Sequence, residues 1–162
     1  MSPDEIERAL QPLVGLSWRA IGRAADVVWL QFGQLRKVPA FKGATKSVGE
    51  WALHLQCDWR LLKDDRGLLS AEDIRIDENG APVIDEPGRL GQSVFDDAAW
   101  WLNNSLARNA PWTSAISVGK PPSFSILLSD GRKFDIAARG EGEQWRIFQP
   151  ATDGNAHFVV SL

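Results

Sequence analysis

The sequence predicts an α+β protein with mainly antiparallel strands, arranged in a strongly curved sheet or partial barrel. Two segments carry helix-capping residues, one at the N-terminus and one at about 93–108. The other apolar segments alternate with the period of two that is typical of half-buried strands. Short turns rather than crossover helices join these segments, which favours antiparallel pairing. We therefore expect one main helix (about 93–108), one short N-terminal helix and hairpins.

The N-terminal segment carries a complete set of helix-start signals. Ser2 can cap the helix, Pro3 suits its first position and Glu5 completes a capping box. The helix is expected to run from about Pro3 to Leu10, because the proline at position 12 disfavours its continuation.

The main helix is predicted from Ser93 to about Arg108. Ser93 and Asp96 form an acidic variant of the capping pattern, and Pro111 follows the end of the helix. Its expected buried stripe consists of residues at helical spacing, namely Phe95, Ala99, Leu102 and Leu106.

The remaining strands are read from alternation and turn residues. An N-terminal hairpin is expected over 13–33, with its turn at 24–26, and Asp130-Gly131 marks a second hairpin. Residues 145–148 and 157–162 are expected as the closing strands. Polar composition predicts loops at 42–49 and 77–91, and Ile74 with Ile76 suggests a short strand.

Length and charge bound the class of protein. The 162 residues fit one domain (1–162), and no repeat or linker divides them. The net charge of −3 argues against a nucleic-acid partner, because nucleic-acid-binding domains are usually basic. No run approaches the roughly 20 apolar residues needed to cross a bilayer, and the acidic N-terminus lacks a signal-peptide pattern. A cytoplasmic protein without membrane contact is expected.

Residues 50–62 form the most regular predicted strand. Its odd-numbered side chains are all apolar, and its even-numbered ones are mostly polar. His54 and Cys57 therefore point to opposite faces and cannot share a metal ion without a bulge, so no metal is expected. Cys57 is expected to be a buried small hydrophobe rather than a nucleophile. No catalytic residue or cofactor motif is identified.

The polar side of this strand is the best candidate for a site. Its ligand or interaction candidates are His54, Gln56, Asp58 and Arg60, together with Arg146 from a later strand. Asp135 and His157 could join them. A histidine, a carboxylate and an arginine in a cleft can perform acid–base chemistry or hold an anion. The alternatives are a solvated sheet face or a polar network between sheet and helix. Arg60 and Arg146 could also form buried ion pairs with neighbouring aspartates, a structural role.

The same strand resembles a known family. Residues 51–61, Trp-Ala-Leu-His-Leu-Gln-Cys-Asp-Trp-Arg-Leu, follow an aromatic-Ala-Leu-His-x-Gln-Cys-x-Trp-Arg motif of a family of small uncharacterised bacterial proteins. The segments 13–33, 145–148 and 157–160 are also similar to that family. The resemblance implies a bacterial, stand-alone domain, and it carries no activity, cofactor or catalytic residue.

Eight tryptophans and no tyrosine make an unusual aromatic inventory. Four of them lie on predicted core faces, namely Trp18, Trp51, Trp59 and Trp145. Trp100 and Trp101 instead flank the buried stripe of the main helix, about 140° and −120° from its first residue at 100° per residue. We expect at least one of these two rings to be partly exposed and to lie in a subunit or partner contact.

These observations favour a non-catalytic binding or interaction domain, with a homodimer or another protein as its partner. An immunity-type or accessory protein would be of this kind. The alternative is a small-ligand binder or an enzyme that uses the His54, Asp58 and Arg60 face, and a deep pocket that contains His54 and Arg60 would favour it.

Overall fold

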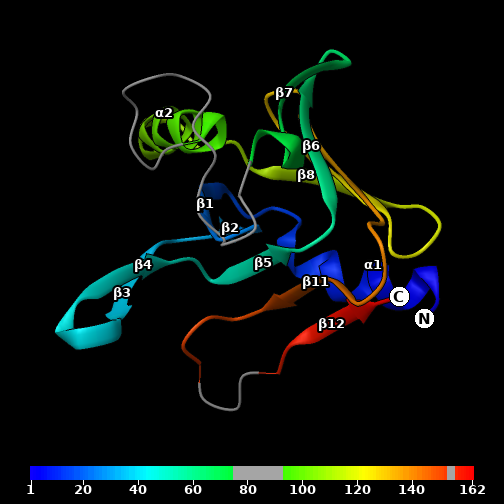
Figure 1. Ribbon diagram of the computed structural model, residues 1–162, viewed down its shortest axis with the longest axis horizontal. Coiled ribbons are helices and arrows are strands. Elements are labelled where there is room, and N and C mark those ends of the chain that lie inside the picture. The colour runs from blue at the N-terminus through cyan, green and yellow to red at the C-terminus, as the bar shows by residue number, and fades with distance from the viewer. Residues whose placement is uncertain (75–92, 153–155) are drawn as a thin grey trace.

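The computed structural model (Figure 1) describes residues 1–74, 93–152 and 156–162. The helices are α1 (Pro3–Leu10) and α2 (Val94–Arg108). The strands are β1 (Trp18–Ala24), β2 (Val27–Phe32), β3 (Arg36–Pro39), β4 (Thr45–Val48), β5 (Trp51–Leu55), β6 (Asp58–Lys63), β7 (Arg66–Ser70), β8 (Thr113–Val118), β9 (Phe124–Leu128), β10 (Arg132–Ala137), β11 (Glu143–Phe148) and β12 (Phe158–Ser161). The α+β prediction is confirmed. The expected excursion at 77–91, Ile76 and most of the turn before β12 lie outside the described residues.

The strands form two five-stranded sheets, both open. The first sheet has the order β1-β2-β5-β11-β12, and the second has the order β7-β6-β10-β9-β8. Every pairing in them is antiparallel, as predicted. β3 and β4 pair only with each other and extend from the first sheet as an arm (Figure 1). The curved sheet of the prediction is therefore divided into two sheets that do not close into a barrel.

Both sheets and both helices contribute to one apolar core. Trp18 and Trp145 from the first sheet and Trp59 from the second are almost completely buried, as expected, whereas Trp51 is only partly buried. The rings of Trp18 and Trp59 both contact Phe134. The two sheets thus share a single hydrophobic interior.

The two helix starts form as the sequence predicts. Glu5 N donates to Ser2 Oγ, and Ser2 N donates to the Glu5 carboxylate at 2.7 Å. The same reciprocal pair joins Ser93 and Asp96 at the start of α2. None of the helices in the described parts of the chain is long and apolar enough to span a membrane.

Polar contacts fix α2 to the open edge of β1. Asn103 exchanges two hydrogen bonds with the backbone of Ile21, at 2.8 and 2.9 Å. Arg23 donates two hydrogen bonds of 2.8 Å to the carboxylate of Asp96. These contacts hold one side of α2 against the first sheet and leave the opposite side exposed.

Two local predictions are wrong. The expected loop at 42–49 contains β4, which pairs with β3, and Ile74 follows a short 3-10 turn rather than lying in a strand. A bulge between Trp18 and Ala20 also shifts the register of β1. As a result, the fully buried side chains of that strand, Trp18 and Ile21, are three residues apart.

The predicted strand at 50–62 is two strands. β5 ends at Leu55 and β6 begins at Asp58, and the chain crosses from the first sheet to the second at Gln56 and Cys57. The alternation of buried and exposed side chains continues across this crossing, because both strands face the same core. The polar side chains before and after it therefore belong to different sheets.

Candidate functional site

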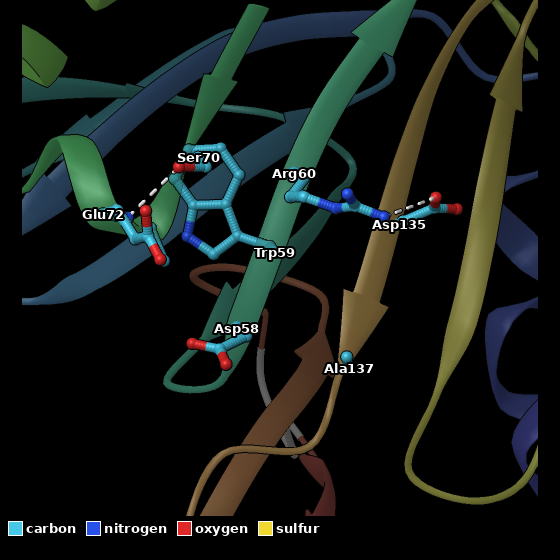
Figure 2. Close-up of a pocket in the computed structure, with 8 residues that line it drawn as sticks. Asp58, Trp59, Arg60, Ser70, Glu72, Asp135 and Ala137 are labelled. Atoms are coloured by element: carbon cyan, nitrogen blue, oxygen red, sulfur yellow. Dashed lines mark hydrogen bonds and ion pairs between the residues drawn. The ribbon is translucent and has the colours of Figure 1, made fainter. Parts of the chain in front are cut away.

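An open groove of about 500 Å³ with a polar lining lies on the second sheet (Figure 2). β6, β10 and the turn after β7 line it. Its lining residues are Asp58, Trp59, Arg60, Ser70, Ala71, Glu72, Asp135 and Ala137. Because three of its four charged side chains are carboxylates, we call it the acidic groove.

The register between β6 and β10 brings the first charged pair together. Arg60 lies opposite Asp135, and its Nη2 atom is 3.7 Å from the Asp135 carboxylate. The Arg60 side chain is 64% exposed, so this ion pair is not the buried one that the sequence suggested. Asp135 also accepts a 2.6 Å hydrogen bond from Ser125 Oγ and lies 3.5 Å from Lys133 Nζ.

A capped turn supplies the second wall of the acidic groove. Ser70 N donates to the Asp73 carboxylate at 2.8 Å, and Glu72 N donates to Ser70 Oγ at 3.3 Å. This turn places Glu72 across the groove from β6, where Asp58 begins the strand (Figure 2). Glu72 was not among the predicted site residues, although the spacing of Ser70 and Asp73 is a capping signal that could have located the turn.

Trp59 contributes an indole ring to the acidic groove. Its ring extends from β6 toward the Ser70–Glu72 turn (Figure 2), while its side chain is only 2% exposed. The opposite part of the ring packs edge-on against Phe95 of α2, with ring centroids 5.9 Å apart. Trp59 therefore links the hydrophobic core to the polar lining of the groove.

His54 lies outside the acidic groove, in a separate cluster on the first sheet. Its ring packs edge-on against Phe148 at 4.8 Å, and the other face of Phe148 stacks on His157 at 4.1 Å. Arg146, opposite His54 in the register, binds Glu143 through two hydrogen bonds and reaches His157 Nδ1 at 3.0 Å. We call these five residues the histidine cluster.

The histidine cluster keeps His54 neutral at ordinary pH. Burial is the main cause, and the positive charge of Arg146 and repulsion by His157 add to it, so that the pKa of His54 is lowered to about 4. Arg146 is held by Glu143 and, like Arg60, makes a partly exposed ion pair. The neutral imidazole of His54 packs edge-on against an aromatic ring and does not line the acidic groove.

The predicted site residues thus form two groups rather than one. Asp58 and Arg60 lie together in the acidic groove, whereas His54 and Arg146 lie together in the histidine cluster. Gln56 stands at the crossing between the sheets, exposed, with its backbone N–H donating to Gln144 O at 2.8 Å. The acid–base site built from His54, Asp58 and Arg60 is not assembled.

α2 exposes the two adjacent tryptophans. Trp100 is 59% exposed and Trp101 is 68% exposed, and their rings pack edge-to-face at 4.7 Å. Beside them an apolar groove of about 370 Å³ separates α2 from β7. Its lining residues are Leu61, Leu68, Leu69, Ala98, Trp101, Leu102 and Ser105. We call the two rings and this groove the tryptophan face, and the predicted exposure is confirmed for both rings.

Cys57 is buried at the crossing between the sheets, as predicted. Burial raises the pKa of its thiol to about 12, so the reactive thiolate is scarce at neutral pH. We expect a thiol reagent to label Cys57 slowly in the folded protein and at least about 100-fold faster in denaturant. Labelling can be followed by mass spectrometry of samples quenched over time. Equal rates in the folded protein and in denaturant would show that the thiol is accessible.

The chemistry of these sites must be argued from the chain alone. Comparison with known protein families, curated proteins and solved structures finds no match. Across residues 1–74, 93–152 and 156–162, no three side chains of His, Cys, Asp or Glu gather as metal ligands would. The acidic groove, the histidine cluster and the tryptophan face are therefore the features from which a function is inferred.

Proposed function

We propose that the protein is a non-catalytic interaction domain that binds protein through the tryptophan face, with a second copy of the same chain as its partner. The observation that carries this proposal is the exposure of two adjacent tryptophan rings, 59% and 68%, on one helix. An immunity-type or accessory protein would act by contacts of this kind.

The core of the protein does not require either ring. The buried side of α2 is formed by Phe95, Ala99 and Leu106, and Trp100 and Trp101 point away from it. Large apolar rings beside an apolar groove are costly to leave in water, and tryptophan is enriched among the residues that dominate binding energy at interfaces. The arrangement therefore favours a surface that is covered by a protein partner.

The shape of the tryptophan face favours a second copy. A twofold interface uses the same patch on both copies, so that patch must carry both protrusions and hollows. The protrusions of each copy then fill the hollows of the other. Here the exposed ring of Trp101 lines the apolar groove, and the ring of Trp100 packs against Trp101. Antiparallel contact of two α2 helices would also bring the acidic first turn of one copy near the basic last turn, with Arg108, of the other copy.

The alternative function, an enzyme or small-ligand binder that uses His54, Asp58 and Arg60 together, has weaker support. It needs these three side chains in one cleft, and His54 does not line the acidic groove. The edge-on contact of His54 with Phe148 gives this residue a packing role instead.

Sedimentation velocity at about 10–100 μM tests the proposal. We expect the wild-type chain to dimerise, and Trp101→Ala and Trp100→Ala to weaken the dimer about 30-fold each, the effect of losing about 2 kcal/mol at an interface hot spot. Thermal melts of the monomeric variants should stay within a few degrees of the wild type at equal concentration.

Trp112→Ala is the matched control for this experiment. Trp112 is 56% exposed at the entry to β8 and does not line the apolar groove, so its loss should leave association unchanged. Arg108→Glu should weaken the dimer, more so at low salt. A wild-type chain that stays monomeric would exclude the second copy as partner, and large losses of stability in the Trp100 and Trp101 variants would assign the rings to the core.

A further inference from the structure

We propose that the acidic groove binds a primary ammonium group whose neighbouring carbon bears a carbonyl group, the chemistry of a peptide N-terminus or of a small α-amino amide. This inference is independent of the tryptophan face, because different residues line the two surfaces. It rests on two observations, the charge of the groove and the indole N–H of Trp59.

The first observation is that two carboxylates of the acidic groove are available to a cation. The closest cation to Asp58 among the described residues is Arg139 at 3.8 Å, and both side chains are more than half exposed. The backbone of Glu72 is fixed by Ser70, while its carboxylate is turned toward the groove (Figure 2). Asp135, by contrast, is occupied by Ser125, besides the cations that flank it.

The second observation is that Trp59 lacks an acceptor that the other buried tryptophans have. Trp18 Nε1 donates to Ala20 O at 3.0 Å, and Trp145 Nε1 donates to Pro122 O at 2.8 Å. Within the described parts of the chain, Trp59 Nε1 donates to no protein atom, although the side chain is 2% exposed and lines the groove. The nitrogen itself is not fully enclosed, so its N–H opens into the groove, where an acceptor can meet it. The nitrogen edge of this ring faces the side of the groove where Glu72 lies (Figure 2).

Together the two observations select the ligand chemistry. The carboxylates of Asp58 and Glu72 repel an anion and attract an ammonium group, which is a strong hydrogen-bond donor to carboxylates. The indole N–H of Trp59 can donate to a neutral acceptor beside that ammonium, and neither a metal ion nor a simple alkylammonium provides one. An α-amino carbonyl group provides both, and a groove of about 500 Å³ is of a size that accepts small ligands.

Nuclear magnetic resonance of the indole N–H groups tests the proposal at the atom concerned. The eight tryptophans give a small set of Nε1–H signals in the ¹⁵N-labelled protein, and Trp59→Phe identifies the one from Trp59. Alanyl-alanine amide, with a free amine, should shift this signal with a Kd of about 1 mM or lower. The N-acetylated form of the same peptide should not shift it, because it has no ammonium group.

Glycinamide separates the two sources of the ligand. Binding of glycinamide as tight as that of the dipeptide amide would indicate a small α-amino amide, whereas tighter binding of the dipeptide would indicate a polypeptide N-terminus. Either result supports the shared chemistry of the proposal.

Carboxylate variants test the charge of the acidic groove without altering its packing. Asp58→Asn and Glu72→Gln should each weaken binding at least about tenfold, the loss of one charge-assisted hydrogen bond. Asp65→Asn, in the β6–β7 turn and outside the groove, is the matched control and should bind as the wild type does. The proposal is wrong if no amine shifts the Trp59 signal, if the acetylated peptide shifts it equally, or if the double variant D58N/E72Q binds unchanged.

Discussion

Asn103→Leu is expected to lower the free energy of unfolding by about 3 kcal/mol, although leucine has nearly the size of asparagine. Asn103 Nδ2 donates to Ile21 O at 2.8 Å, and Ile21 N donates to Asn103 Oδ1 at 2.9 Å. Leucine leaves both backbone groups without a partner, and an unsatisfied, partly buried polar group costs about 1–3 kcal/mol.

The position of Ile21 explains why one side chain has this effect. β1 is an edge strand, and its neighbour on the one paired side is β2. The N–H and C=O of Ile21 point to the open edge, where the amide of Asn103 pairs with them as a further strand would. The side chain of α2 thus closes part of a sheet edge and positions the helix that exposes the tryptophan face.

Urea unfolding of Asn103→Leu and Asn104→Leu measures this contribution. The side chain of Asn104 is exposed and donates only within its own helix, to Trp100 O, so its replacement should change stability by less than about 1 kcal/mol. We also expect Asn103→Leu to weaken self-association, because the helix that carries Trp100 and Trp101 loses its anchor. Equal stability of the two variants would mean that water replaces the amide at no cost.

Signals that act over a few residues predict this fold well. The Ser93 and Asp96 pair locates the start of α2, and Asp130-Gly131 lies in the turn between β9 and β10. Helical spacing on α2 also predicts which side is buried and that Trp100 and Trp101 lie beside it. In each case the residues that determine the local structure lie a few positions apart, so tertiary contacts do not change that structure.

The division of the polar side chains between two sheets could not be read from alternation. Cys57 and Trp59 are buried just as Leu55 is, because β5 and β6 face the same core after the chain has changed sheets. A periodic pattern records only which side is buried and not which strands lie alongside. His54 and Asp58 therefore looked like members of one face, although they belong to different sheets.

The β3–β4 arm was not predicted, for a different reason. Val38 and Val48 are the buried side chains of these two strands, too few to produce a recognisable period. The backbone hydrogen bonds of the β3–β4 pair, rather than burial of a face, define the arm.

Glu72 was missed because its place in the acidic groove depends on a turn. Turns bring side chains together without any sequence period.

Acid is expected to destabilise the protein through His54. The pKa of this imidazole is about 4 in the folded protein, below its ordinary value of 6.5, because the ring is largely buried and lies near Arg146 and His157. Below pH 6.5 the unfolded chain takes up a proton that the folded chain excludes, so stability falls as the pH drops from about 6.5 toward 4. Above pH 6.5 the imidazole is neutral in both states and contributes no pH dependence.

The size of this effect follows from the shift in pKa. One unit corresponds to about 1.4 kcal/mol, and the ring is partly open to solvent, so we expect a loss of about 2 kcal/mol between pH 7 and 4.5 from this residue. The charged groups around it come from several elements. Arg146 and Glu143 belong to β11, His157 precedes β12 and Lys46 lies on β4, and of these only Glu143 favours the protonated form.

Urea unfolding at pH 7 and at pH 4.5 isolates the contribution of His54. His54→Gln removes the titrating group, and we expect it to lose about 2 kcal/mol less than the wild type between the two pH values. His157→Gln is the matched control, since it removes the other histidine of the cluster and one of the lesser causes of the shift while leaving the burial of His54 in place, so most of the acid sensitivity should remain. If His54→Gln loses as much stability in acid as the wild type does, carboxylates elsewhere are responsible and the folded protein accommodates the charged imidazole.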